Sequence, residues 1–435
     1  MKNQTILLSL ILIISIPFQL YSQTITNEEK DETIESIIRN IETVYPFQNI
    51  SDKTIIKLKK QVAKGAYNKY RNPKEFATGI TNDLEQFSND KHLDLLYNPQ
   101  MVQALSEESD SDGFAYTVEE AKIEMWNNYG FKELSILDGN IGFLNLTVFF
   151  ATEYAGNIAD NAMAFFANCN ALIIDLRQNG GGWGDMVDYL LGYFINNKEP
   201  LLISIAQSTL DSTYYSSVIP NHVPNKKLNN IPIYILTSPT TASAAEAFVS
   251  WMKYLNDNVI IVGKTTSGAE NPVSHIALNK DFVLQIPSWK KVYFKNTVSW
   301  ERKGINPDIE STDAKKTAHI LALEKLSENT SDELTNDKIQ WALNGLRANY
   351  DNPESENFKK YEGRYDNIKI KFDDGMLYCQ YKERPFNKLI PISDTYFLVD
   401  GIDYYRIKFN VADRKIILHQ IFSFGTEREI ERNNQ

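Results

Sequence analysis

Short apolar segments alternate with helical segments between residues 139 and 266, and this alternation constrains the fold more than any other feature of the chain. Four segments are strand-like: IGFLNLTVF (141–149), ALIIDL (171–176), IPIYIL (231–236) and VIIVGKTT (259–266). Segments of helical character lie between them, at 155–168, 186–195 and after Ser243. Strands that alternate with helices predict an α/β domain, with a largely parallel sheet whose faces are covered by helices.

The regions on either side have different patterns. Residues 24–90 carry apolar side chains at helical spacing, and residues 312–350 are polar and helical. Beyond residue 356, apolar and polar residues alternate, and Asp374-Gly375 stands between two such runs, as in a β-hairpin. We therefore predict these parts: a leader (1–22), an N-terminal helical domain (23–130), the α/β domain (131–325), a helical linker (326–355) and a small antiparallel β domain (356–435).

Composition excludes several classes of function. The chain has 435 residues, 43% of them hydrophobic, so it can bury large cores. Its formal net charge is −11 and it has no block of Lys or Arg, which argues against a nucleic-acid partner. Its two cysteines, Cys169 and Cys379, are far apart and form neither a metal cluster nor a disulfide framework. We expect no metal and no cofactor.

The first 22 residues have the features of a secretory signal peptide. Lys2 precedes an apolar run from Ile6 to Leu20, and Ser22 closes the segment. A membrane anchor is the alternative, but the run is short for a span and is broken by Ser and Pro. No cysteine follows that could carry a lipid. We expect a mature protein that begins near Gln23, works in the periplasm or outside the cell, and has no stable membrane span.

Ser243 lies where the apolar segment 231–236 leads into a helix. A serine at such a corner can present its hydroxyl to a substrate, and the first amides of the helix are free to bind negative charge on an attacked carbonyl oxygen. Ser243 and Glu246 also have the spacing of a capping box, which begins a helix without doing chemistry. From this segment alone, the capping role is favoured.

A second segment, DLRQNGGG, follows directly from the strand at 171–176. Its three glycines, Gly180 to Gly182, let the backbone approach a ligand and leave amides free to face it. The spacing matches no phosphate-binding motif. A plain tight turn and an oxyanion-binding turn both fit the pattern.

A serine nucleophile needs a base, and an acid usually orients that base. The chain has five histidines: His92, His222, His275, His319 and His419. His92 lies in NDKHL, at the end of a helical stretch, and Glu301 follows Trp300 in WERKGINPDI. Taken alone, each of these residues is more often structural than catalytic.

In chain order, these pieces resemble peptidase family S41, over about residues 80–312. The resemblance is carried by ALIIDLRQNGGG, by YILTSPTTASAAEAF with Ser243 at the family's serine, by VIIVGKTTSGA, and by the W-E-x-x-G-[VI]-x-P-D pattern at Trp300. It implies a crotonase-like ββα core, so that the α/β domain would be the catalytic domain.

Two catalytic plans exist in this family. Processing peptidases pair the serine with a lysine, but Ala269 stands in that position here and cannot accept a proton. Lys264 lies nearby in sequence but precedes the turn. There is also no room between about 96 and 140 for a PDZ domain. The other plan, that of tricorn-like and retinoid-binding-like members, uses histidine and glutamate, and NDKHL resembles its D-x-H-[LT] motif, although Lys91 stands where some members have a serine.

The resemblance thus implies a serine peptidase that acts on polypeptides. Ser243 would be the nucleophile, His92 the general base and Glu301 the acid that orients the imidazole. The oxyanion donors would be the amide of Ala244 and that of Gly181 or Gly182. A non-catalytic module that binds an apolar ligand or a peptide on the same scaffold is the alternative. The sequence leaves the substrate, the role of the β domain and assembly into a homo-oligomer open.

Overall fold

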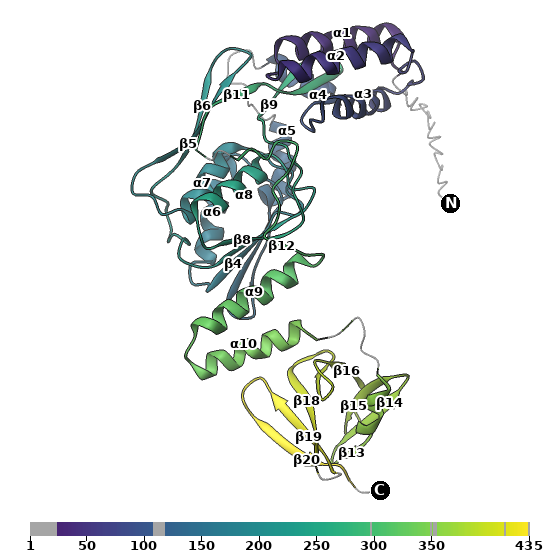
Figure 1. Cartoon of the computed structure of the whole chain (residues 1–435), viewed down its shortest axis with the longest axis vertical. Helices are drawn as coiled ribbons and strands as arrows, with labels where there is room; N and C mark the ends of the chain where they lie inside the picture. Colours follow the sequence, from purple (N-terminus) through teal and green to yellow (C-terminus); the bar gives the residue numbers. More distant parts are fainter. Residues whose placement is uncertain are drawn as a thin grey trace, which may run out of the picture. The chain divides into compact units, whose positions relative to one another are not determined.

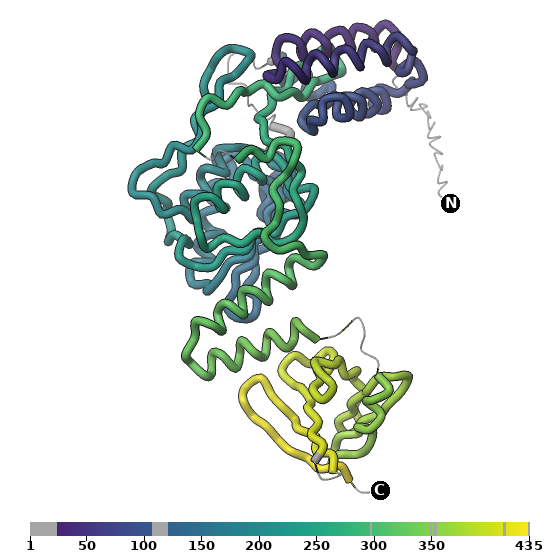
Figure 2. The backbone as a smooth tube through the Cα atoms, in the orientation of Figure 1, coloured from purple at the N-terminus to yellow at the C-terminus, as the bar shows by residue number. Residues whose placement is uncertain are grey.

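The computed structural model describes residues 24–107, 118–295, 298–348, 350, 355–412 and 415–433, so the predicted signal peptide lies outside the described residues. The chain divides into two compact units (Figures 1 and 2). The first unit combines the part up to Thr117 with Ser208–Ser212 and Pro272–Lys290, and the second takes the rest. We describe each unit by itself.

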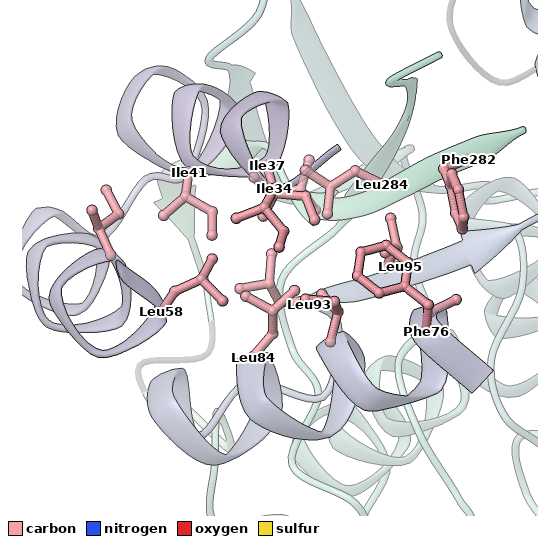
Figure 3. Packing of buried hydrophobic residues seen from close by; sticks show 14 of the residues in the cluster. Ile34, Ile37, Ile41, Leu58, Phe76, Leu84, Leu93, Leu95, Phe282 and Leu284 are labelled. Carbon is pink, nitrogen blue, oxygen red and sulfur yellow. The ribbon is translucent and has the colours of Figure 1, made fainter. Parts of the chain in front are cut away.

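The first unit packs helices against a three-stranded antiparallel sheet. Its elements are α1 (Asn27–Thr43), α2 (Gln48–Ala63), α3 (Pro73–Ser88), β1 (Asp94–Tyr97), α4 (Pro99–Glu107), β9 (Val273–Ala277) and β10 (Phe282–Pro287). Thr26 and Asn72 cap α1 and α3 by accepting backbone N–H bonds, as side chains at helix starts commonly do. The apolar faces of the helices, including Ile37 and Leu84, meet Leu284 of β10 in one core (Figure 3).

Residues 272–290 therefore fold with the N-terminal helices, although they follow the Ser243 helix in the chain. Strand β10 pairs with β1 in antiparallel register, with Asp94 opposite Gln285. This long-range pairing gives the unit a discontinuous sequence. The predicted boundary at residue 130 took no account of this excursion.

The second unit is built on a six-stranded sheet in the order β12-β8-β7-β4-β3-β2. These strands are β2 (Phe131–Leu137), β3 (Ile141–Leu146), β4 (Ala171–Asp175), β7 (Ile233–Thr237), β8 (Val259–Gly263) and β12 (Ile309–Glu310). All neighbours are parallel except the β2–β3 pair. Every residue of β4 and of β7 is buried, as expected of strands with both faces covered.

Helices cover both faces of this sheet. On one face, α9 (Ala314–Asn329) and α10 (Glu333–Leu346) pack on Ile173 and Tyr234, among other strand residues. The helices α6 (Thr152–Phe165), α7 (Gly184–Phe194) and α8 (Ala244–Leu255) pack side by side in the same unit (Figure 1). The short α5 (Val118–Trp126) precedes the sheet. A smaller antiparallel sheet has the order β11-β5-β6, from β5 (Leu201–Ser208), β6 (Tyr214–Ile219) and β11 (Trp289–Phe294).

The C-terminal part is an eight-stranded antiparallel meander in sequence order. Its strands are β13 (Gly363–Tyr365), β14 (Ile368–Asp373), β15 (Met376–Tyr381), β16 (Asn387–Pro391), β17 (Tyr396–Val399), β18 (Ile402–Ala412), β19 (Lys415–Phe422) and β20 (Glu427–Glu431). Asp374 and Gly375 join β14 to β15 with φ of 47° and 77°, which matches the positive values that a two-residue hairpin turn requires. The predicted α/β class, helical N-terminal part and C-terminal antiparallel β part are confirmed.

Among the described residues, no helix is both long and apolar enough to cross a bilayer.

Helix α7 is tied to β6 by a buried carboxyl group. Asp188 is 9% exposed, and one of its oxygens accepts the N–H of Val218 at 3.1 Å. Burial raises the pKa of Asp188 to about 7, although the Val218 hydrogen bond opposes the shift. An unfolded Asp releases its proton near pH 4, so the folded chain retains a proton that the unfolded chain loses between about pH 4 and about pH 7.

In the wild type, the raised pKa of Asp188 lowers the free energy of unfolding by about 1.4 kcal/mol for each pH unit across that range. We predict that Asp188→Asn removes this pH dependence. Urea unfolding at about pH 5 and about pH 7 measures this. The free energy of unfolding of the variant, relative to that of the wild type, should be higher at about pH 7 than at about pH 5. The exposed Asp257 offers the control Asp257→Asn. An equal difference between variant and wild type at both pH values would contradict the prediction.

Candidate active site

Ser243 occupies a sharp turn between β7 and α8. It is the residue before the first turn of α8, with φ of 53° and ψ of −120°. A positive φ is uncommon for a residue with a side chain, and such a conformation persists only where its surroundings hold it. The preceding loop is fixed from within the unit, because Thr241 Oγ1 donates to the carbonyl oxygen of Leu176 at 2.8 Å. The turn therefore presents Ser243 on a rigid support.

The carboxylate of Glu246 holds this turn through hydrogen bonds. Glu246 is fully buried, and one oxygen accepts the N–H of Ser243 at 3.1 Å and that of Ala269 at 2.8 Å. The other oxygen accepts the hydroxyl of Thr266 at 2.5 Å and the N–H of Gly268 at 2.7 Å. Burial raises the pKa of Glu246, and these four hydrogen bonds oppose the shift. The predicted capping residue thus also joins the Ser243 turn to the loop after β8.

The glycine turn lies directly against Ser243. A Cβ atom on Gly181 would stand 2.8 Å from the Cβ of Ser243, so only glycine fits this position, and φ of 120° at Gly181 also requires glycine. The buried Asn179 braces the turn: its Nδ2 donates to the carbonyl oxygen of Leu146, and its own carbonyl oxygen accepts the N–H of Ala242. Arg177 pairs with Asp175 through two hydrogen bonds at the start of the turn.

The predicted oxyanion donors differ in their availability. The N–H of Gly181 donates to Oδ1 of Asn179 at 2.9 Å and is therefore engaged. Within the described ranges, the N–H groups of Ala244 and Gly182 donate to no other protein group. Ala244 begins α8, where the helix itself offers no acceptor. Of the two glycines proposed from the sequence, Gly182 is the one with a free amide.

The position at which related peptidases carry a lysine is closed here. Ala269 is 2% exposed, and its N–H is bound to Glu246. Lys264 is exposed, and its backbone pairs with Thr237. The first of these residues has no group that can accept a proton, and the second points its charge toward solvent.

Glu301 lies in the same unit as Ser243 and is mostly buried, with 11% of its side chain exposed. Its carboxylate accepts the N–H of Glu270 at 2.8 Å, and its own N–H donates to the carboxylate of Glu270 at 3.0 Å. Trp300 beside it is buried. Since Ala269 is bound to Glu246 and Glu270 to Glu301, two adjacent residues connect the Ser243 turn with Glu301.

His92 belongs to the first unit, in the turn between α3 and β1. It is 8% exposed, and its backbone N–H donates to the carboxylate of Asp90 at 2.9 Å. The same carboxylate accepts the hydroxyl of Tyr45 at 2.6 Å. Its Nδ1 is buried without a hydrogen-bond partner in the part of the chain that the structure describes. Burial lowers the pKa of His92, and the charge of Asp90 partly opposes this. Ser243, the glycine turn and Glu301 thus share one unit, and His92 lies in the other.

Two other histidines have structural partners. His275 pairs with the side chain of Gln285, and His319 with the carbonyl oxygen of Asp138. In the described residues, one group could offer three metal ligands, namely His419, Glu427 and Glu429 on β19 and β20. The exposed Lys408 lies directly opposite His419 in the sheet, and its charge disfavours a cation there.

Sequence reasoning assigned Glu246 a cap and missed its other partners. The Ser243–Glu246 spacing revealed only the local contact, because Thr266, Gly268 and Ala269 approach from the loop after β8. Asn179 was overlooked in favour of the glycines that follow it. Glu270 and Lys291, which surround Glu301, carry no motif of their own.

Comparison with known proteins finds a family match over this part of the chain. The family model described as Peptidase family S41 matches residues 140–311, the segment that contains the glycine turn, Ser243 and Glu301. The solved structures that match this chain include a candidate peptidase from Parabacteroides merdae ATCC 43184, which is 20% identical, with a TM-score of 0.43 over 65% of this chain and 89% of that one.

Two further solved structures are more distant. The photosystem II D1 C-terminal processing protease is 13% identical, with a TM-score of 0.40 over 66% of this chain and 94% of that one. The tricorn protease is 11% identical, with a TM-score of 0.41 over 73% of this chain and 37% of that one. At these scores the assignment depends on the match over residues 140–311 and not on the structural likeness. Residues 140–311 thus match peptidase family S41, and this match supports a serine-type peptidase.

Proposed function

We propose that the chain is a periplasmic or secreted serine peptidase of family S41. It would hydrolyse peptide bonds of polypeptides through Ser243, His92 and Glu301, as in the histidine-dependent branch of that family. The observation that carries the proposal is the backbone of Ser243. Its φ of 53°, at a strand-to-helix turn pressed against Gly181, has no benefit for a plain helix cap, which is satisfied with an ordinary extended conformation.

In the proposed reaction, the hydroxyl of Ser243 attacks the carbonyl carbon of the scissile bond while His92 accepts the hydroxyl proton. The negative oxygen of the tetrahedral intermediate binds the amides of Ala244 and Gly182, which are free to donate. His92 then gives its proton to the leaving amine, and an acyl-enzyme forms on Ser243. Water, activated by the same imidazole, releases the acid product.

The environments of the two partners support their roles. Burial keeps the imidazole of His92 neutral at neutral pH, as a base requires, and its unpartnered Nδ1 can still receive a hydrogen-bond partner. The carboxylate of Glu301 accepts the N–H of Glu270, and its N–H donates to the carboxylate of Glu270. Its side chain is also mostly buried, so its rotamer is fixed. Ala269 is buried and has no group that accepts a proton, which supports the histidine plan over the lysine plan. The extracytoplasmic location is supported by the leader-like residues 1–22.

We predict that Ser243→Ala lowers kcat on an unstructured protein substrate by at least about 10⁴-fold, because no other group can form the acyl-enzyme. The fold should be retained, since Ala keeps the Cβ and the turn is held by backbone bonds. The matched control is Ser216→Ala, at an exposed serine of β6 in the same unit. Proteolysis that persists in the purified Ser243→Ala variant would refute the proposed nucleophile.

We further predict that kcat/KM is retained at mildly acidic pH. A general base works in its unprotonated form, and burial lowers the pKa of His92, so the acidic limb should lie below the ordinary imidazole value of about 6.5. His92→Gln should abolish this limb together with most of the turnover, whereas His222→Gln, at an exposed histidine, should leave both unchanged. An acidic limb at or above about pH 6.5, or full activity in His92→Gln, would contradict the assignment.

A further inference from the structure

We propose that Lys291 is a positioning residue for Glu301: its ammonium group neutralises Glu270 and so allows two adjoining carboxylates to share one mostly buried site. The inference deepens the proposed function, because it depends on a working role for Glu301. Lys291 and Glu270 lie outside every motif that the sequence revealed.

Glu270 is the centre of the arrangement. Only 3% of its side chain is exposed, and its carboxylate accepts hydrogen bonds from the Nζ of Lys291, the hydroxyl of Ser299 and the N–H of Glu301. In return, the N–H of Glu270 donates to the carboxylate of Glu301. The two glutamates therefore fix each other through their backbones.

Two neighbouring ionised carboxylates repel each other unless a nearby cation offsets their charge. Among the described residues around the pair, the cations are Lys291, which contacts Glu270, and Arg302, whose Nε lies 3.8 Å from an oxygen of Glu301. Arg302 follows Glu301 in the chain and moves with it. Lys291 comes from β11, and its ion pair with Glu270 ties the two glutamates to that strand.

Aromatic rings hold the ammonium group in place. The Nζ of Lys291 lies 4.0 Å from the centre of the Phe294 ring and 4.9 Å from that of Trp300. Phe294 packs in turn on Trp251 of α8, with ring centres 4.8 Å apart. Burial lowers the pKa of Lys291, and the charge of Glu270 opposes this. Through these ring contacts and its ion pair with Glu270, Lys291 links α8, which begins at the Ser243 turn, to the loop of Glu301.

Lys291→Met tests the proposal. The variant keeps most of the apolar stem but leaves the buried Glu270 without its counter-charge, so the Glu301 loop should shift. We expect kcat to fall by about 10²-fold, with KM little changed, because misplacement of a group that acts in the chemical step costs about this much. The control is Lys290→Met, at the exposed neighbouring lysine on β11, which should leave kcat unchanged.

Two more variants separate positioning from packing and from base catalysis. Lys291→Arg keeps the charge but cannot give up its proton, so it should retain most of the activity. The double variant Lys291→Met/Glu270→Gln removes both charges and should recover about tenfold over Lys291→Met alone. This double variant also guards against misfolding, because it buries no unpaired charge. Loss of activity in Lys291→Arg, or no recovery in the double variant, would overturn the proposal.

Failure of this inference can be told apart from failure of the proposed function. If wild-type turnover does not depend on Ser243, the proposed mechanism is wrong. If turnover depends on Ser243 but Lys291→Met is as active as the wild type, only the role of Lys291 is wrong.

Discussion

The buried carboxylate of Glu246 is the interaction on which the candidate site depends. It receives four hydrogen bonds from two loops that are far apart in the sequence, including those from the amides of Ser243 and Ala269. Hydrogen bonds to a charged group contribute about 1.5–3 kcal/mol each, and a buried carboxylate without them would be costly. Burial raises the pKa of Glu246 and the four donors oppose it, so the group and its donors require each other.

From this carboxylate, contacts extend in two directions. In one direction, the Ser243 turn meets Gly181, where the space for a Cβ is already occupied by Ser243 itself. In the other direction, the N–H of Ala269 binds Glu246, and the next residue is Glu270. The carboxylate of Glu270 binds Lys291 and the N–H of Glu301. The strained backbone of Ser243 is thus compensated by hydrogen bonds from its surroundings, which is how a strained conformation is kept in a folded protein.

Much of this architecture could be predicted from the sequence, because its signals are local. The apolar segments at 171–176 and 231–236 predicted buried parallel strands, and Asp374-Gly375 predicted a hairpin with its turn in place. The Ser243–Glu246 spacing indicated where α8 begins. In each case the pattern depends on neighbours within a few residues, and the physical cause acts over the same range.

Long-range pairing was beyond such reasoning. No periodicity in residues 272–290 indicates that β10 pairs with β1 and leaves the α/β unit. The sequence could not distinguish Gly181 from Gly182 as a donor either, because the difference arises from the side chain of Asn179, which captures the first amide. Lys291 and Glu270 meet across residues 272–290, which fold with the other unit. Charged residues in a strand, such as Lys291, ordinarily face solvent.

The central claim is that the Ser243 turn presents a reactive hydroxyl. The most direct measurement is mass spectrometry of the purified protein after treatment with a serine-reactive phosphonate, followed by peptide mapping. The account predicts one adduct per chain, on the peptide that contains Ser243, and none after the protein has been unfolded in urea. An adduct on another residue, or no adduct on the folded protein, would contradict it.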